Sequence, residues 1–86
     1  MPNRRTEKEL IQQSPLAAFV KIHRKQLGLD QEEFALRVGV GLAFLKRLES
    51  GKTNLQYAKI LQVLEFFEAT LIPTLKASLN THNETE

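Results

Sequence analysis

The chain contains no cysteine, only four glycines and three prolines, and no apolar run longer than a few residues. The lack of cysteine excludes a disulfide framework and a thiolate metal site. The short apolar runs exclude a membrane-spanning helix. No apolar stretch follows the basic first ten residues, so we expect no signal peptide and a cytoplasmic location. A length of 86 residues fits one domain with a modest hydrophobic core.

Charge is unevenly distributed along this chain, whose formal net charge is only +2. Residues 1–28 hold six basic and two acidic side chains, a net charge of +4, whereas residues 77–86 carry only Glu84 and Glu86. A basic beginning and an acidic end are typical of a polyanion binder, although a solvated charged surface has the same composition. We expect a flexible basic arm over residues 1–13 and a disordered tail over residues 77–86. The six basic residues are Arg4, Arg5, Lys8, Lys21, Arg24 and Lys25.

The first predicted helix has a clear start and a clear end. Ser14 can cap the free backbone N–H groups, and Pro15 is tolerated in the first turn because its missing N–H would have no partner there. Gly28 ends the helix, since glycine accepts the left-handed conformation at a C-terminus. Residues at helical spacing form its inner face: Leu16, Val20, His23 and Leu27.

Two further short helices follow, joined by a glycine turn. Asp30 and Glu33 have the spacing of a capping box and begin the second helix, which Gly39 ends. The third helix runs from about Gly41 to Glu49 and stops at Ser50. Two short helices joined in this way form a helix-turn-helix unit. The apolar residues expected inside are Phe34, Val38, Leu45 and Leu48.

The fourth predicted helix begins near Asn54 and has an unusually wide apolar face. A helix that is apolar on nearly all sides is covered on more than one side. In so small a chain we expect a second copy to supply the second cover. The apolar residues are Leu55, Tyr57, Ile60, Leu61, Val63, Leu64, Phe66 and Phe67.

Residues 69–76 are rich in β-formers and lack a helical stripe, so they predict a short strand. One isolated strand is unstable, and we expect it to pair with the same segment of a second subunit, with Pro73 at an edge. An unpaired extended tail packed on the fourth helix is the alternative. The expected fold is therefore all-α, with four to five helices over residues 14–68 and a dimerisation strand over residues 69–76.

The helix-turn-helix segment resembles a known family. The run from Leu29 to Ala35, LDQEEFA, is similar to the L-T-Q-E-E-L-A opening of the Cro and phage-repressor type, or XRE, helix-turn-helix. Val38-Gly39-Val40 resembles its L-G-V turn. Leu45, Leu48-Glu49 and Gly51-Lys52 match its next segment. The resemblance covers about residues 16–67 and implies a lambda-repressor-like fold that binds DNA.

A narrower resemblance is to HipB-like antitoxins. It is carried by segments in the turn, in the third helix and in the fourth helix. That subfamily also has a strand after the fourth helix, as expected here for residues 69–76. The segments are Gly39-Val40-Gly41, Phe44-Leu45, Leu48 to Lys52, and Ile60 to Glu65.

The family resemblance makes the third predicted helix the recognition helix, whose N-terminal residues enter the major groove. Leu42 and Ala43 can pack on thymine methyl groups, and Arg47 can read guanine through two hydrogen bonds. Lys46 is expected to read a base or a phosphate. Because Leu42 and Ala43 cannot hydrogen-bond to base edges, we expect part of the specificity from DNA shape. Phe44 is expected to pack under the helix.

Six residues are expected to contact DNA phosphates. Gln31 opens the second helix, where free N–H groups and the helix dipole favour an anion, and the family uses this glutamine to clamp the DNA backbone. Asp30 stands where the family usually has threonine and repels phosphate. The other five lie at the start of the third helix and in the loop after it: Gly41, Ser50, Lys52, Thr53 and Asn54.

The resemblance also implies an ion pair between Arg24 and Glu49, which ties the first helix to the third. Such a pair would neutralise the charge of Glu49, which would otherwise lie close to bound phosphate. The alternative is that Arg24 and Glu49 are two unrelated surface charges. The dimer contacts are expected from the fourth helix and the strand after it, at Phe66, Phe67, Leu71 and Ile72.

No arrangement of residues indicates catalysis or a cofactor. His23 falls on an apolar stripe and is expected to be packed, and two distant histidines, His23 and His82, do not make a metal site. We therefore expect a non-enzymatic repressor that binds a palindromic double-stranded DNA operator as a homodimer. The HipB-like resemblance implies an antitoxin that also binds a HipA-like serine/threonine kinase toxin. A stand-alone phage-type repressor is the alternative.

Overall fold

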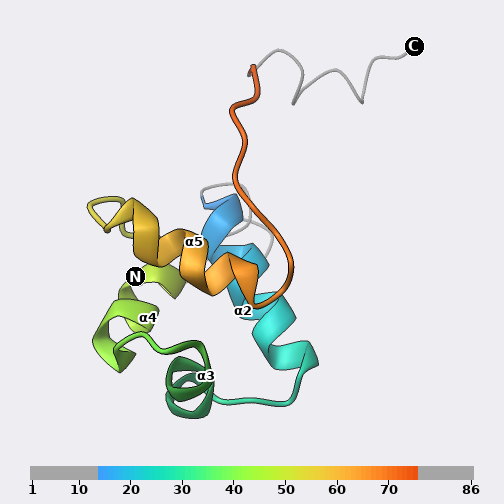
Figure 1. Ribbon diagram of the computed structural model, residues 1–86, viewed down its shortest axis with the longest axis vertical. Helices are drawn as coiled ribbons and strands as arrows, with labels where there is room; N and C mark the ends of the chain where they lie inside the picture. Colours follow the sequence, from blue (N-terminus) through green and yellow to red (C-terminus); the bar gives the residue numbers. More distant parts are fainter. Residues whose placement is uncertain (1–13, 76–86) are drawn as a thin grey trace, which may run out of the picture.

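The computed structural model describes residues 14–75 and is all-helical over that range (Figure 1). Its helices are α2 (Pro15–Gln26), α3 (Gln31–Val38), α4 (Leu42–Glu49) and α5 (Tyr57–Glu65). The expected basic arm over residues 1–13 and the expected tail over residues 77–86 lie outside the described residues, as does Lys76. None of the helices in the described range is both long enough and apolar enough to cross a membrane.

The starts of α2 and α3 follow the predicted caps. The Ser14 hydroxyl accepts the Ala17 N–H at 3.3 Å, and Pro15 is the first residue of α2. The Asp30 carboxylate accepts the Glu33 N–H at 2.8 Å. The expected capping box is only half formed, because the Glu33 carboxylate turns to Arg37 at 3.1 Å. The Glu33 carboxylate thus makes an ion pair one turn along α3 in place of the second capping hydrogen bond.

All four helices end in the same hydrogen-bonding pattern, the Schellman motif. A backbone N–H just past the helix donates to the carbonyl five residues earlier, at 3.0–3.5 Å. The residue before that donor has a positive φ, which is 75° at Gly28, 90° at Gly39 and 88° at Gly51. At the end of α5 the same place is taken by Glu68, with φ 58°, where a side chain costs free energy.

The hydrophobic core lies where the four helices meet, and both α2 and α3 pack against α4. Each helix contributes at least one buried apolar side chain, and full burial of a large one such as Leu45 contributes about 1.5–3 kcal/mol. The position of α4 is therefore set by its inner face. The core residues are Val20, Phe34, Ala35, Val40, Leu45, Leu48, Ile60, Val63 and Leu64.

The last helix is shorter than expected at both ends. It begins at Tyr57 after the N-cap Gln56, so the predicted start near Asn54 is wrong. It ends at Glu65, and Phe66 and Phe67 lie in the turn that follows. Phe67 turns inward, with its ring stacked on Phe34 at a centroid distance of 5.4 Å. The Phe67 side chain therefore packs within its own chain.

Residues 69–75 leave this turn as an irregular extended segment (Figure 1). Ala69 packs against the core, but the rest of the segment is exposed. Of the segment that the sequence alternatively predicts to pack on the last helix, only Ala69 packs against the core. The described residues of this single chain contain no strand. Pairing of residues 69–76 across two subunits therefore stays a prediction.

Candidate functional site

The site is built on α3, α4 and the tight turn between them. The turn holds three residues, of which Gly39 has φ 90°, Val40 is buried and Gly41 is the N-cap of α4. The left-handed conformation at Gly39 reverses the chain at no steric cost, and burial of Val40 anchors the turn to the core. This arrangement is the helix-turn-helix unit that the sequence predicts.

One face of α4 points into the core and the other faces solvent. Leu45 and Leu48 are fully buried, whereas Ala43, Lys46 and Arg47 are exposed. Leu42 is half-buried at the start of the helix, and Gly41 before it is exposed. The structure therefore brings three of the four predicted base readers to one solvent-facing surface, with Leu42 at its margin.

Phe44 lies on the side of α4 that faces α5. It is half-buried and packs against the core, as expected from the sequence. The Lys59 ammonium lies 5.8 Å from the centroid of its ring, within reach of a cation–π contact. Phe44 is thus a supporting residue beneath the exposed face of α4.

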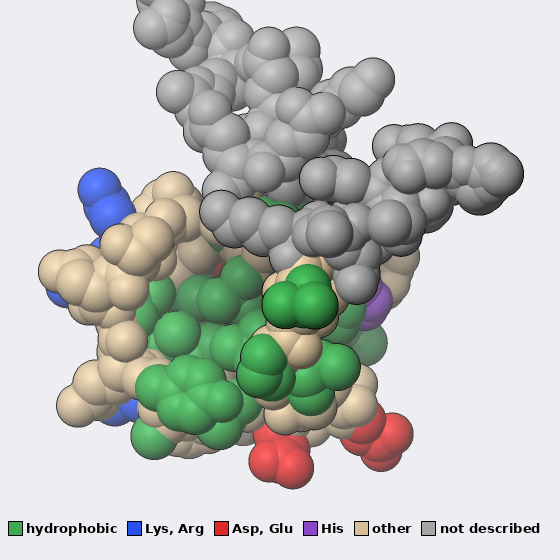
Figure 2. Space-filling view, turned by 90° about the horizontal axis from the view of Figure 1, so that it is seen from above, with side chains coloured by type: hydrophobic (Ala, Val, Ile, Leu, Met, Phe, Trp, Pro, Cys, Tyr) green, Lys and Arg blue, Asp and Glu red, His purple; other side chains and the backbone are tan. Residues whose placement is uncertain are grey.

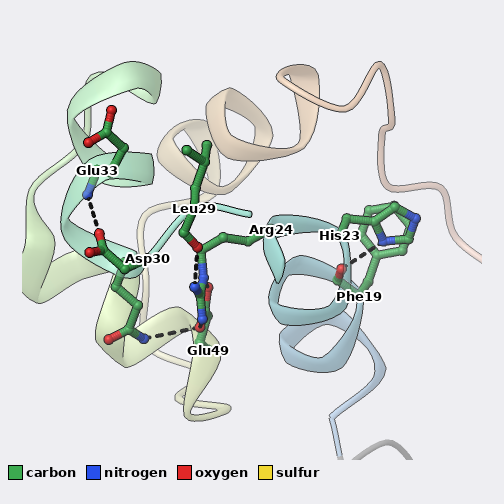
Figure 3. Close-up of polar contacts among 8 residues, drawn as sticks. Phe19, His23, Arg24, Leu29, Asp30, Glu33 and Glu49 are labelled. Atoms are coloured by element: carbon green, nitrogen blue, oxygen red, sulfur yellow. Dashed lines mark hydrogen bonds and ion pairs between the residues drawn. The ribbon is translucent and has the colours of Figure 1, made fainter. Parts of the chain in front are cut away.

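A buried network of charged and polar groups holds the end of α4 (Figure 3). Arg24 donates from Nε to Glu49 Oε2 at 2.7 Å and from Nη2 to Oε1 at 3.0 Å. Its third donor, Nη1, reaches the Leu29 carbonyl at 2.7 Å. The two charged side chains are only 7% and 3% exposed. Since both charges are paired and hydrogen-bonded, the network can link α2, the α2–α3 loop and α4 without leaving a charge uncompensated.

Gln31 completes this network instead of facing only solvent. Its Nε2 donates to Glu49 Oε1 at 3.0 Å, so the first residue of α3 is also tied to the last residue of α4. Glu49 thus accepts donors from two other elements. The sequence pattern indicates a helix N-terminus at Gln31 but contains no signal for this contact, because its partner is 18 residues away.

The loop after α4 carries the remaining predicted phosphate contacts. Ser50, Lys52, Thr53 and Asn54 are all exposed. The Ser50 hydroxyl donates to the Arg47 carbonyl at 2.9 Å, and Asn54 Oδ1 accepts from Arg47 Nη2 at 3.4 Å. Asn54, which the sequence indicates as a helix cap, therefore lies beside the guanidinium of Arg47 instead.

His23, which the sequence predicts to be packed, lies within the fold of the chain. Its Nδ1 lies 2.9 Å from the Phe19 carbonyl, and its ring lies 4.0 Å from the Phe19 ring (Figure 3). Its second aromatic neighbour is Phe67, at a centroid distance of 5.5 Å. This aromatic cluster joins α2 to the turn after α5.

Large apolar side chains are exposed near the end of the described chain. The exposed fraction is 40% at Phe66, 37% at Leu71, 73% at Ile72 and 76% at Leu75. Figure 2 shows hydrophobic side chains gathered on the face from which the segment after α5 projects. Three of the four predicted dimer residues are therefore exposed, and the fourth, Phe67, is half-buried in the aromatic cluster.

Gln62 is a functional candidate that sequence reasoning missed. Its side chain extends from α5 to the turn, and Nε2 donates to the carbonyls of Val38 at 3.0 Å and Gly39 at 3.3 Å. Within residues 14–75, no other side chain of α5 makes a hydrogen bond to the helix-turn-helix unit. A single polar residue on an apolar helix is an ordinary sequence feature, so nothing local distinguishes it.

Comparison with known proteins gives the same assignment. A curated protein of Sinorhizobium fredii (strain NBRC 101917 / NGR234), the uncharacterized HTH-type transcriptional regulator y4mF, is 48% identical over 50 residues. The match covers 58% of this chain and 66% of that relative, so the chain spans just under two thirds of its length. No solved structure matches the chain significantly. The family model described as helix-turn-helix matches residues 20–72, more than half of the sequence. The chain therefore belongs to the helix-turn-helix family, of the XRE type.

Proposed function

We propose that this protein is a sequence-specific DNA-binding transcriptional repressor that acts as a homodimer on a palindromic operator. The observation that carries the proposal is the geometry of α4. Its inner face is buried, its end is held by the Arg24–Glu49 pair, and Lys46 and Arg47 are exposed on its outer face. A rigid helix with exposed cationic side chains is what major-groove recognition requires.

Base recognition would combine apolar contacts with one or two polar readers. Arg47 would donate to N7 and O6 of a guanine, and Lys46 would contact a base or a phosphate. Leu42 and Ala43 would pack on thymine methyl groups. Because apolar side chains give few hydrogen-bond constraints, the operator preference would also depend on how easily the DNA bends.

Backbone phosphates would be contacted on both sides of α4. The exposed loop after the helix supplies Ser50, Lys52, Thr53 and Asn54, and Gly41 precedes the helix. Gln31 would keep its hydrogen bond to Glu49 and offer its second amide hydrogen to a phosphate. Contacts of this kind set the register on DNA without reading sequence.

Dimerisation would use the exposed apolar residues after α5. Phe66, Leu71 and Ile72 are exposed, and residues 69–76 have the composition of a strand. A second copy that paired with this segment would satisfy its backbone groups and cover its side chains. Phe67 would contribute indirectly, since it packs on Phe34 within the subunit.

A finer proposal is that the protein is the antitoxin of a toxin–antitoxin operon. Its support is the resemblance of Gly39-Val40-Gly41, Phe44-Leu45 and Ile60 to Glu65 to HipB-like proteins. The partner would be a HipA-like serine/threonine kinase encoded by a neighbouring reading frame. Co-expression and co-purification of that neighbour would support this role, and a neighbour that does not bind would leave a stand-alone phage-type repressor.

The test of the main proposal is selection of bound sequences from random duplex DNA. We expect two inverted half-sites about one helical turn apart, each read by one α4. Affinity should fall steeply as salt increases, because bound phosphates release counterions. Selection of a single unpaired half-site would contradict the homodimer, and no enrichment at all would contradict sequence-specific DNA binding.

A further inference from the structure

Gln62 links the two parts of the molecule to which the proposed function gives separate roles, the end that dimerises and the helix-turn-helix unit that binds DNA. It lies on α5, the helix that leads into the exposed apolar segment 69–75. Its amide reaches the last residue of α3 and the turn that begins the approach to α4. The contact therefore spans from the helix beside the proposed dimer face to the turn that aims the recognition helix.

The chemistry of this contact suits a positioning role. The last carbonyls of a helix have no partner within the helix, so Val38 and Gly39 offer acceptors that a side-chain donor can satisfy. The fit is close, because a Cβ at Gly39 would lie 3.2 Å from Gln62 Nε2. A glycine with φ 90° thus both turns the chain and leaves room for the amide.

We propose that Gln62 is a positioning residue that sets the angle between the dimer interface and the recognition helix, and so the spacing of the half-sites. This inference rests on the proposed function as a dimeric DNA-binding protein. In a two-fold dimer the separation of the two α4 helices depends on how each is held relative to the shared interface. Loss of a hydrogen-bonded link on each side allows each α4 to tilt, and the dimer then accepts half-sites at more than one separation.

The experiment measures spacing preference separately from base preference. Full-length protein is titrated with duplexes that carry the selected half-sites at their selected separation, or with one base pair inserted between them. One inserted pair rotates the second half-site by about 35° and so tests the relative orientation of the two recognition helices. The ratio of the two dissociation constants is the spacing preference, and a one-base mismatch within a half-site gives the base preference.

Substitution of the amide should change the spacing preference alone. Gln62→Glu keeps the shape of the side chain but removes the donor. A typical hydrogen bond contributes about a twofold to tenfold factor, so we expect the spacing preference to fall about threefold to tenfold. Base preference should be unchanged. Gln62→Lys restores a donor suited to a helix C-terminus and should keep the spacing preference of the original chain.

Two controls keep the result interpretable. Gln56→Ala changes a glutamine at the start of α5 that makes no side-chain cap hydrogen bond, and it should leave both preferences unchanged. Gln62→Ala removes the donor without adding charge and repeats the test if the glutamate variant does not fold. Circular dichroism at the assay temperature checks that each variant is helical.

The outcomes separate this inference from the proposed function. If the original chain prefers one spacing and Gln62→Glu and Gln62→Ala keep that preference, the positioning role is wrong while DNA binding stands. If the original chain binds single half-sites with no preference for spacing, the homodimer of the proposed function fails and this inference fails with it. If the original chain binds no duplex at all, the proposed function fails and this inference fails with it.

Discussion

At the residue scale, Glu49 is the side chain that ties the end of α4, the proposed recognition helix, to the rest of the fold. Its carboxylate accepts two hydrogen bonds from Arg24 and one from Gln31, and it is only 3% exposed. A buried carboxylate without such partners would pay a large desolvation cost. The three donors come from α2 and α3, so satisfying one charge also holds α4 against two other helices.

Removal of one partner should therefore destabilise the fold strongly. We expect Arg24→Met to lower the free energy of unfolding by about 3–5 kcal/mol, because it leaves the Glu49 charge buried and unpaired. The double variant Arg24→Met/Glu49→Leu should regain most of that loss. Urea denaturation followed by circular dichroism measures both values.

An exposed ion pair in the same molecule provides the control. Glu33 and Arg37 lie 3.1 Å apart on α3 with side chains that are 50% and 56% exposed. Arg37→Met should cost no more than about 1 kcal/mol, because solvent screens the pair. If Arg24→Met and Arg37→Met lower the free energy of unfolding equally, the buried network contributes no more to stability than an exposed ion pair.

The exposed residues around α4 should divide into base readers and phosphate contacts. Arg47→Ala should reduce discrimination between operator and mismatched duplexes, with about 1–3 kcal/mol lost at one base position. Lys52→Ala should weaken binding to all duplexes alike. It should also reduce by about one the slope of the logarithm of the binding constant against the logarithm of salt concentration. Fluorescence anisotropy over a range of salt concentrations measures both effects, and equal loss of discrimination from the two variants would refute this division.

At the element scale, the ends of the helices are the most regular feature of the chain. Three Schellman motifs have glycine at the left-handed position, and the motif after α5 has Glu68 with φ 58°. A side chain in that conformation is strained relative to glycine. The end of α5 is therefore less stable than the other three ends, and it is the end from which segment 69–75 departs.

Relief of this strain should stabilise the protein. We expect Glu68→Gly to raise the free energy of unfolding by about 0.5–1 kcal/mol. Glycine removes the backbone strain in the folded state, and this gain exceeds the loss that comes from the greater freedom of the unfolded chain. Gly39→Ala should do the opposite, since its φ is 90° and its Cβ would press on Gln62. Thermal unfolding measures both changes, and a Glu68→Gly variant that melts earlier would contradict the strain argument.

At the scale of the whole molecule, the described chain leaves several large apolar side chains exposed after α5. Leu71, Ile72 and Leu75 are exposed in the segment after α5, and Phe66 is exposed in the turn that precedes this segment. Contiguous exposed apolar side chains are typical of a protein–protein interface. A second copy is the partner that the proposed function requires, because a palindromic operator has two equal half-sites.

Charges placed in this segment should separate the subunits. We expect Leu71→Lys/Ile72→Lys to raise the dissociation constant of the dimer by about tenfold or more, from the loss of buried apolar area and from repulsion across the two-fold axis. The matched control is Thr70→Lys/Thr74→Lys, which adds the same charge to exposed polar positions of the same segment. Sedimentation equilibrium compares them, and equal dissociation constants would remove residues 69–75 from the interface.

The local features of the fold could be predicted from the sequence. Ser14 and Asp30 begin their helices, Gly39 makes the turn, and Leu45 and Leu48 form the inner face of α4. The helix-turn-helix assignment is confirmed by the family match over residues 20–72. Each of these features depends on residues within a turn or two of one another, and the sequence pattern contains that information directly.

The tertiary structure decided the partners of the polar side chains. Gln31 reaches Glu49, Asn54 meets Arg47, and Gln62 spans from α5 to the turn. The side-chain amides of glutamine and asparagine can hydrogen-bond to donors and acceptors of many kinds. Their partners are therefore decided by which polar groups the packing of the helices brings within about 3 Å of the amide. Phe67 likewise points inward, because the packing of α3 against the end of α5 lets its ring stack on Phe34. The sequence by itself thus determined the helix-turn-helix unit, because its caps, turn and inner face are local features. Packing between the helices determined how that unit is held.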